Sequence, residues 1–176
     1  MEFKKIMTEL LLELDKRHIP YAIVGAVAMG FWGVRRDTMD IDFLVKAADR
    51  EKILALMKGF GYDHAVSSNF ADQFVHFIRT MGSVDFLYTK KEKGIIESST
   101  TFRGLDGKEI HVALPEDIIG MKLEGIRNNP KREMKDWADI QSIVELLGDD
   151  LDWEKIKGYC KITGMKDGYD KILSFR

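Results

Sequence analysis

The chain has 176 residues, of which 45% are hydrophobic and 32% are charged, and its formal net charge is −2. This composition is that of a globular protein and excludes a disordered chain. The near-neutral charge gives no support for a protein that coats DNA or an anionic membrane. The single cysteine, Cys160, excludes an internal disulfide and a cysteine-based zinc site, and we expect it to pack as a small core residue.

No stretch of the sequence is apolar enough to predict a membrane-spanning segment. The amino-terminal segment carries charges on every helical turn, unlike the apolar core of a signal peptide. We therefore predict a cytoplasmic protein with no membrane partner.

The first part of the chain alternates between helical and strand patterns. Apolar residues at helical spacing predict an amphipathic helix over 2–17. A short β-type segment over 21–24 is broken at Gly25, and a short helix is predicted directly after it. Acidic and large apolar residues alternate over 39–45, which predicts a strand, and a second helix is expected over 49–59.

The patterns that follow predict strands first and then helices. Three β-type runs, over 63–67, 73–80 and 83–88, predict an antiparallel meander with Met81-Gly82 as its last turn, and strands over 99–103 and 108–114 predict a hairpin with Asp106-Gly107 as its turn. Helices are expected over 115–127, 131–147, 152–161 and 165–174. We therefore predict an α/β core over 1–114 and a helical carboxyl-terminal annex over 115–176 that packs on the core.

Two aspartates share one face of the strand predicted over 39–45. A period of two places Asp40 and Asp42 on one face and Ile41 on the other. Adjacent carboxylates repel each other unless a cation neutralises them, and oxygen ligands suit Mg²⁺ or Mn²⁺. A lone Asp-x-Asp pattern is more often a solvated face. The upstream turn at Gly25 and a third acid, Asp85, within an apolar strand favour a metal site here.

These residues resemble the signature of the nucleotidyltransferase-fold superfamily. That signature is an apolar residue before Gly-Gly or Gly-Ser, a short helix, an Asp-x-Asp strand and a later single acid. The match here is Val24-Gly25-Ala26, Asp40-Ile41-Asp42 and Asp85. Within the superfamily the chain is most similar to AbiEii-like and minimal bacterial nucleotidyltransferases, because Gly33, Arg36 and Thr38 complete the pattern G-x-x-R-x-T-x-D-x-D and the similarity continues through 115–143.

The resemblance implies a mixed β-sheet core flanked by helices and the transfer of a nucleoside monophosphate from an NTP to an acceptor hydroxyl. It implies that Asp40, Asp42 and Asp85 are catalytic and bind Mg²⁺ or Mn²⁺, which stabilise the attacking and leaving oxygens. The residues that it assigns to the nucleotide are Gly25, Ala26, Arg36, Thr38, Lys122 and Asp139. The acceptor stays open between tRNA, a protein and a small molecule.

One residue departs from the signature and supports an alternative function. Ala26 stands where the superfamily usually has Gly or Ser, so no serine hydroxyl contacts a phosphate and only backbone N–H groups remain. The alternative is a weak or inactive module that binds a nucleotide or partner in a toxin–antitoxin pair; an active AbiEii-like toxin would likewise have an antitoxin partner. For Lys122 and Asp139 the alternative is a solvated helix face with ordinary ion pairs.

Overall fold

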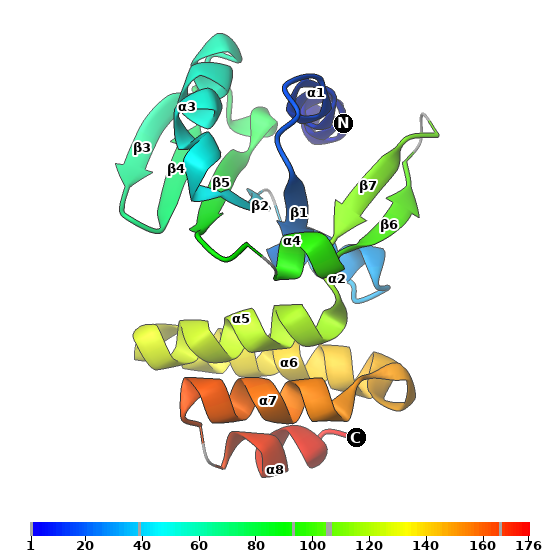
Figure 1. The fold of residues 1–176 in the computed structure, drawn as a ribbon. Coiled ribbons are helices and arrows are strands. Elements are labelled where there is room, and N and C mark those ends of the chain that lie inside the picture. The colour runs from blue at the N-terminus through cyan, green and yellow to red at the C-terminus, as the bar shows by residue number, and fades with distance from the viewer. Residues whose placement is uncertain (1, 39, 93, 105–106, 166) are drawn as a thin grey trace. The chain divides into compact units, whose positions relative to one another are not determined.

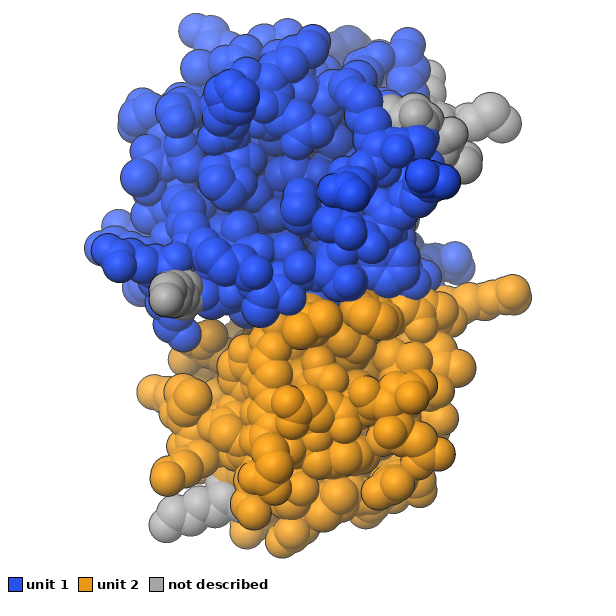
Figure 2. Space-filling view, turned by 45° about the vertical axis from the view of Figure 1, so that its right-hand side comes forward, with its two compact units in different colours: residues 1–31, 36–113 blue, residues 32–35, 114–176 orange. Residues whose placement is uncertain are grey.

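The protein is described by a computed structural model that covers residues 2–38, 40–92, 94–104, 107–165 and 167–176. It forms two compact units, one of residues 1–31 and 36–113 and one of residues 32–35 and 114–176 (Figure 2). The first unit combines strands and helices, whereas the second is helical (Figure 1). Across the described parts of the chain, no helix is both long and apolar enough to cross a membrane.

The first unit contains all the strands of the described structure. Its helices are α1 (Glu2–Lys16), α2 (Gly25–Phe31), α3 (Arg50–Gly59) and α4 (Ile95–Ser98), with short 3-10 turns η1 (Ala47–Asp49) and η2 (Arg79–Met81). Its strands are β1 (Tyr21–Val24), β2 (Asp40–Lys46), β3 (Asp63–Ser67), β4 (Ala71–Val75), β5 (Ser83–Thr89), β6 (Thr100–Arg103) and β7 (Glu109–Val112).

These strands form one seven-stranded mixed sheet in the order β3-β4-β5-β2-β1-β7-β6. The pairs β2–β5 and β1–β7 are parallel, and the other pairs are antiparallel. The predicted fold class, a mixed sheet flanked by helices with a helical carboxyl-terminal region, is confirmed. The antiparallel arrangement predicted for β3, β4 and β5 is also confirmed. The order makes β2 and β5 neighbours in the middle of the sheet.

One face of β2 and β5 is apolar because their residues alternate. Ile41, Phe43, Val84 and Phe86 are fully buried, and the rings of Phe43 and Phe86 stack with centroids 5.2 Å apart. Burial of each such side chain stabilises the fold by about 1.5–3 kcal/mol. The residues between them, which include the acids, point to the other face of the sheet.

One element prediction in the first unit is corrected, and one helix was missed. The strand predicted over 73–80 ends at Val75, and the chain then bends, with the Ile78 N–H donating to His76 Nδ1 at 3.0 Å before η2 begins. Phe77 and Ile78 look like strand residues in the sequence, but both are exposed and cover no core. The short helix α4 was not predicted, and Asp106 of the predicted hairpin turn lies outside the described residues.

The helical unit is built from α5 (Pro115–Asn128), η3 (Pro130–Arg132), α6 (Glu133–Leu147), η4 (Gly148–Asp150), α7 (Trp153–Thr163) and α8 (Gly168–Leu173). Helices α5 and α7 approach closely because the Tyr159 ring packs against Gly120, where a Cβ atom would overlap it. Asp152 begins α7 by accepting the Lys155 N–H at 3.0 Å, and Gly164 ends it with a φ of 71°. Cys160 is buried as expected, and burial raises the pKa of its thiol.

Candidate active site

The predicted acids on β2 and β5 share one face of the sheet. In the parallel register, Asp42 lies opposite Asp85, and Asp40 lies opposite Ser83. Since residues that face each other across neighbouring strands point to the same side, Asp40, Asp42 and Asp85 share that side. Residues 43 positions apart in the sequence therefore come together because β2 and β5 pair directly.

Gly25 follows β1 at the point where the chain comes nearest to Asp42. Val24 pairs with Asp42 in the antiparallel β1–β2 register, and Gly25 comes next with a φ of 65°. A Cβ atom on Gly25 would overlap the Asp42 carboxylate. Both the positive φ and this close approach require glycine, so the backbone turn and the second acid of the motif form one local structure.

Asp40 is held at the start of β2 by two hydroxyl groups. Its Oδ1 accepts a hydrogen bond from Ser83 Oγ at 2.5 Å, and its backbone N–H donates to Thr38 Oγ1 at 3.1 Å. The Thr38 hydroxyl thus accepts the backbone N–H of the first residue of β2, and its role in this structure is to stabilise the start of that strand. The Asp40 side chain remains exposed.

Asp85 has one satisfied and one unsatisfied carboxylate oxygen. Gln73 Nε2 donates to Asp85 Oδ2 at 3.4 Å, whereas the buried Oδ1 has no hydrogen-bond partner among the described residues. Burial raises the pKa of Asp85, the Gln73 hydrogen bond opposes this rise, and the nearby negative charge of Asp40 adds to it. A buried oxygen without a donor carries a desolvation cost that a cation would offset.

The donor set fits a divalent cation in its chemistry but is not arranged as a finished ligand shell. Carboxylate oxygens are the ligands that Mg²⁺ and Mn²⁺ prefer, and Asp85 Oδ1 is free of other donors in the described structure. However, no group of three or more His, Cys, Asp or Glu side chains within the described ranges is arranged to hold a metal ion. Asp40 and Asp85 instead each accept a hydrogen bond from a neighbouring strand.

In the helical unit, Lys122 of α5 lies in a buried ion cluster. Its Nζ lies 2.5 Å from Asp139 Oδ2 and 3.4 Å from Asp136 Oδ1, and Asp136 also accepts from Arg132 Nε at 2.9 Å. Only 7% of Lys122 is exposed, against 6% of Asp139 and 0% of Asp136. The interpretation of these residues as a solvated face is therefore wrong. The cluster joins α5 to α6.

The remaining predicted residues, Ala26 and Arg36, lie in the first unit. Ala26 belongs to α2 and is buried, so its methyl group packs in the interior. Arg36 is half-buried in the segment before β2, whereas the neighbouring Arg35 belongs to the helical unit.

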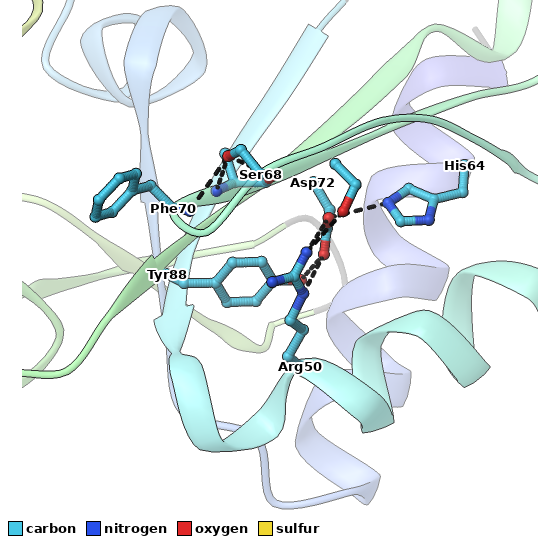
Figure 3. Close-up of polar contacts among 8 residues, drawn as sticks. Arg50, His64, Ser68, Phe70, Asp72 and Tyr88 are labelled. Carbon is cyan, nitrogen blue, oxygen red and sulfur yellow. Dashed lines mark hydrogen bonds and ion pairs between the residues drawn. The ribbon is translucent and has the colours of Figure 1, made fainter. Parts of the chain in front are cut away.

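The first unit also contains a buried polar cluster, around Asp72, that was not predicted. The fully buried Asp72 of β4 accepts from Arg50 Nε and Nη2 at 2.9 and 2.6 Å and from the Tyr88 hydroxyl at 2.8 Å, and His64 Nε2 lies 2.9 Å from it (Figure 3). Neighbouring strand residues point to opposite faces, so Asp72 lies on the face of β4 that Gln73 does not use. The strand predicted over 73–80 did not include Asp72, whereas β4 begins at Ala71. A signal was present, because Asp72 lies two residues before Phe74 and so in the apolar phase of this strand, where an acid requires a buried partner.

Comparisons with known proteins find likeness in structure alone. No protein-family model and no curated protein matches the sequence. A solved structure of an antigenic nucleotidyltransferase-like protein from Paracoccidioides brasiliensis is 16% identical, with a TM-score of 0.57 over 99% of this chain and 93% of that chain. The ANT(2'')-Ia structure in complex with adenylyl-2''-tobramycin is 15% identical, with a TM-score of 0.56 over 98% of this chain and 96% of that chain.

A third likeness covers less of the chain. The lincomycin-bound lincosamide antibiotic adenylyltransferase LnuA is 16% identical, with a TM-score of 0.51 over 65% of this chain and 82% of that chain. Together these likenesses show that the chain has the nucleotidyltransferase fold.

Proposed function

We propose that the chain is a metal-dependent nucleotidyltransferase. The observation that carries this proposal is the pairing of Asp42 with Asp85 on one face of a nucleotidyltransferase-fold sheet. One buried oxygen of Asp85 accepts no hydrogen bond from any described residue. The reaction transfers a nucleoside monophosphate from an NTP to an acceptor hydroxyl and releases pyrophosphate. The acceptor oxygen bonds to the α-phosphorus as the bond to pyrophosphate breaks, and the hydroxyl proton leaves towards Asp85.

In this proposal Asp40, Asp42 and Asp85 would hold Mg²⁺ or Mn²⁺, and the ion would neutralise charge on the triphosphate. We assign Asp85 to the acceptor side, and the position of its strand next to β4 and away from the turn at Gly25 supports this assignment. Gly25 lets the backbone approach the phosphates without a side chain, and Ala26 borders them through its backbone only. Arg36 and Thr38 belong to the same segment, where the Arg36 guanidinium is suited to a phosphate.

Lys122 and Asp139 enter the proposal through the resemblance to AbiEii-like enzymes. That resemblance assigns Lys122 to the triphosphate and Asp139 to the orientation of the lysine. The contact between Lys122 and Asp139 at 2.5 Å supports the orienting role. From the same resemblance we propose a role as a toxin component with an antitoxin partner.

The acceptor is proposed from three classes: tRNA, a protein and a hydroxylated small molecule. The adenylyltransferases of similar fold include one bound to lincomycin and one in complex with adenylyl-2''-tobramycin. These likenesses support an adenylyl donor and a small-molecule acceptor as the first pair to assay.

The test combines binding with transfer. We expect Mn²⁺ with a non-hydrolysable ATP analogue to raise the melting temperature, and the Asp40→Ala/Asp42→Ala variant to lose that rise. Asp63→Ala removes an exposed acid of β3 and serves as a matched control that keeps it. Transfer of label from α-labelled NTPs to bulk tRNA, to the chain itself or to a hydroxylated small molecule then identifies the acceptor. A wild-type chain that shows neither a shift nor labelling would refute the proposal.

A second candidate function is an inactive module that binds a nucleotide or a partner. The buried methyl group of Ala26 favours it, because no hydroxyl at this position reaches a phosphate. A nucleotide-dependent shift without transfer to any of the three acceptor classes would support this function over turnover.

A further inference from the structure

Gln73 occupies the position next to Asp85 on the acid-bearing face of the sheet. In the antiparallel β4–β5 register, Gln73 pairs directly with Asp85, and its Nε2 donates to Asp85 Oδ2 at 3.4 Å. Asp42, Asp85 and Gln73 therefore follow one another across three adjacent strands. The amide engages one oxygen of Asp85, and the other, Oδ1, has no donor within the part of the chain that the structure describes.

We propose that Gln73 is a positioning residue, which fixes the carboxylate plane of Asp85 so that Oδ1 faces the ion and acceptor of the proposed reaction. The terminal torsion of an aspartate is broad, so the strand alone does not orient this group. A donor to one oxygen restricts that torsion, as outer-shell partners do for metal ligands. This inference rests on the proposed function and adds a residue that the sequence motif does not contain.

An amide suits this position better than a cation or an acid would. Lys or Arg would form an ion pair with Asp85 and compete with a bound metal ion, whereas Glu would add a further negative charge beside Asp40 and Asp42. Gln73 donates a hydrogen bond without changing the charge of the face.

The Asp72 cluster restrains β4 from the face opposite to Gln73. Asp72 directly precedes Gln73 and is fixed by Arg50, Tyr88 and His64 on the opposite face (Figure 3). Because the two residues are consecutive, ion pairing on one face restrains the backbone that carries the amide on the other. A side chain that must reach Asp85 with correct geometry benefits from such a rigid strand.

The first test measures Mn²⁺ affinity by electron paramagnetic resonance. We expect Gln73→Leu, which keeps a similar volume but removes the donor, to weaken Mn²⁺ binding by about tenfold to hundredfold. Val66→Ala is the matched control, because Val66 pairs with Gln73 from β3 and is exposed. Equal affinity in wild type and Gln73→Leu would overturn the positioning role. Equal losses in Gln73→Leu and Val66→Ala would also overturn it, since they would indicate a general effect on the hairpin.

The second test needs no metal and separates this inference from the proposed function. In the metal-free wild type we expect the chemical shifts of the Gln73 side-chain ¹⁵NH₂ group to differ from those of a free amide. In Asp85→Ala we expect these resonances to return to free-amide values. Displaced resonances in a chain that binds no Mn²⁺ would refute the metal-dependent function and leave the contact established. Resonances at free-amide values in the wild type would refute the contact itself.

Discussion

Asp42 and Asp85 lie opposite each other on the parallel strands β2 and β5, and Gly25 lies against the Asp42 carboxylate. Three segments that are distant in the sequence thus meet at one place on the sheet. The relationship links the fold to the proposed chemistry, because the pairing that buries Phe43 and Phe86 on one face brings the two carboxylates together on the other.

Gly25 is the first residue whose change should break this arrangement. Gly25→Ala places a Cβ atom in a left-handed conformation and against the Asp42 carboxylate. We expect the free energy of unfolding to fall by at least about 2 kcal/mol, measured by urea denaturation.

The matched control for that substitution is Gly59→Ala. Gly59 is the last residue of α3, and beyond its own helix backbone and chain neighbours a Cβ atom there meets no atom of the described residues within 4 Å. We expect this variant to be unchanged or up to about 1 kcal/mol more stable. Equal losses in the two variants would argue against the close approach between Gly25 and Asp42.

Lys122 should be essential for the stability of the helical unit. Lys122→Met leaves the buried Asp139 carboxylate without its cation, and removal of one partner from a buried ion pair costs about 3–5 kcal/mol. Thermal unfolding followed by circular dichroism should show a lower transition temperature. Lys135→Met, which replaces an exposed lysine of α6, should leave that temperature nearly unchanged.

A double variant separates the fold from nucleotide binding at this cluster. Lys122→Met/Asp139→Leu removes the two charges of the Lys122–Asp139 pair, while Arg132 still pairs with the buried Asp136. We expect the double variant to regain most of the stability that Lys122→Met loses. It should still show no nucleotide-dependent melting shift, because it lacks the proposed contact between Lys122 and the triphosphate. A recovered shift in the double variant would remove Lys122 from the nucleotide site.

Asp72 should control the stability of the first unit in acid. Burial raises the pKa of Asp72, but hydrogen bonds from Arg50, Tyr88 and His64 outweigh it and hold that pKa below its ordinary value. The unfolded chain then binds more protons than the folded chain, so this stabilisation is present above about pH 4 and is lost as the pH falls through the folded pKa.

Asp72→Asn tests this acid dependence. The variant should be less stable than the wild type near neutral pH, because the buried side chain loses its charge and its ion pair with Arg50. Its free energy of unfolding should also fall less steeply than that of the wild type between about pH 4 and pH 2, in urea titrations at each pH. If the free energy of unfolding fell equally steeply with pH in the two proteins, Asp72 would not be the group that titrates.

The sequence allowed the central strands to be predicted because their side-chain period is strict. Alternation along β2 assigned Asp40 and Asp42 to one face and Ile41 to the other, and the apolar run around Asp85 placed it in a strand. The pairing of β2 with β5 is a long-range contact that no local pattern encodes, so the resemblance was needed to expect it. His76, Phe77 and Ile78 were mistaken for strand residues because apolar character does not reveal exposure.

Buried charge was the main feature that local patterns missed. Acids and lysines are usually exposed, so no local pattern predicted that Asp72 and Lys122 would be buried. Both are buried, with partners from other elements. Gln73 was missed for a different reason. An amide in a strand carries no motif, and its role emerges only from the register that places it opposite Asp85.

The last prediction is that Asp85 lowers the stability of the metal-free protein. Burial raises the pKa of Asp85, Gln73 opposes this rise, and the charge of Asp40 adds to it. The folded chain therefore holds this proton more tightly than the unfolded chain, and ionisation of Asp85 destabilises the fold as the pH rises above the ordinary aspartate range. Asp85→Asn removes the charge, so the metal-free variant should be about 1 kcal/mol more stable at pH 7.

The same variant should lose the melting shift caused by Mn²⁺ with a nucleotide, because an amide is a poor ligand for the ion. Differential scanning calorimetry with and without Mn²⁺ and an ATP analogue measures both effects on one sample. Asp63→Asn, an exposed acid of β3, should change neither. If metal-free Asp85→Asn is less stable than the wild type, the carboxylate stabilises the fold. If the variant is more stable and also loses the melting shift, the carboxylate serves binding and lowers the stability of the fold.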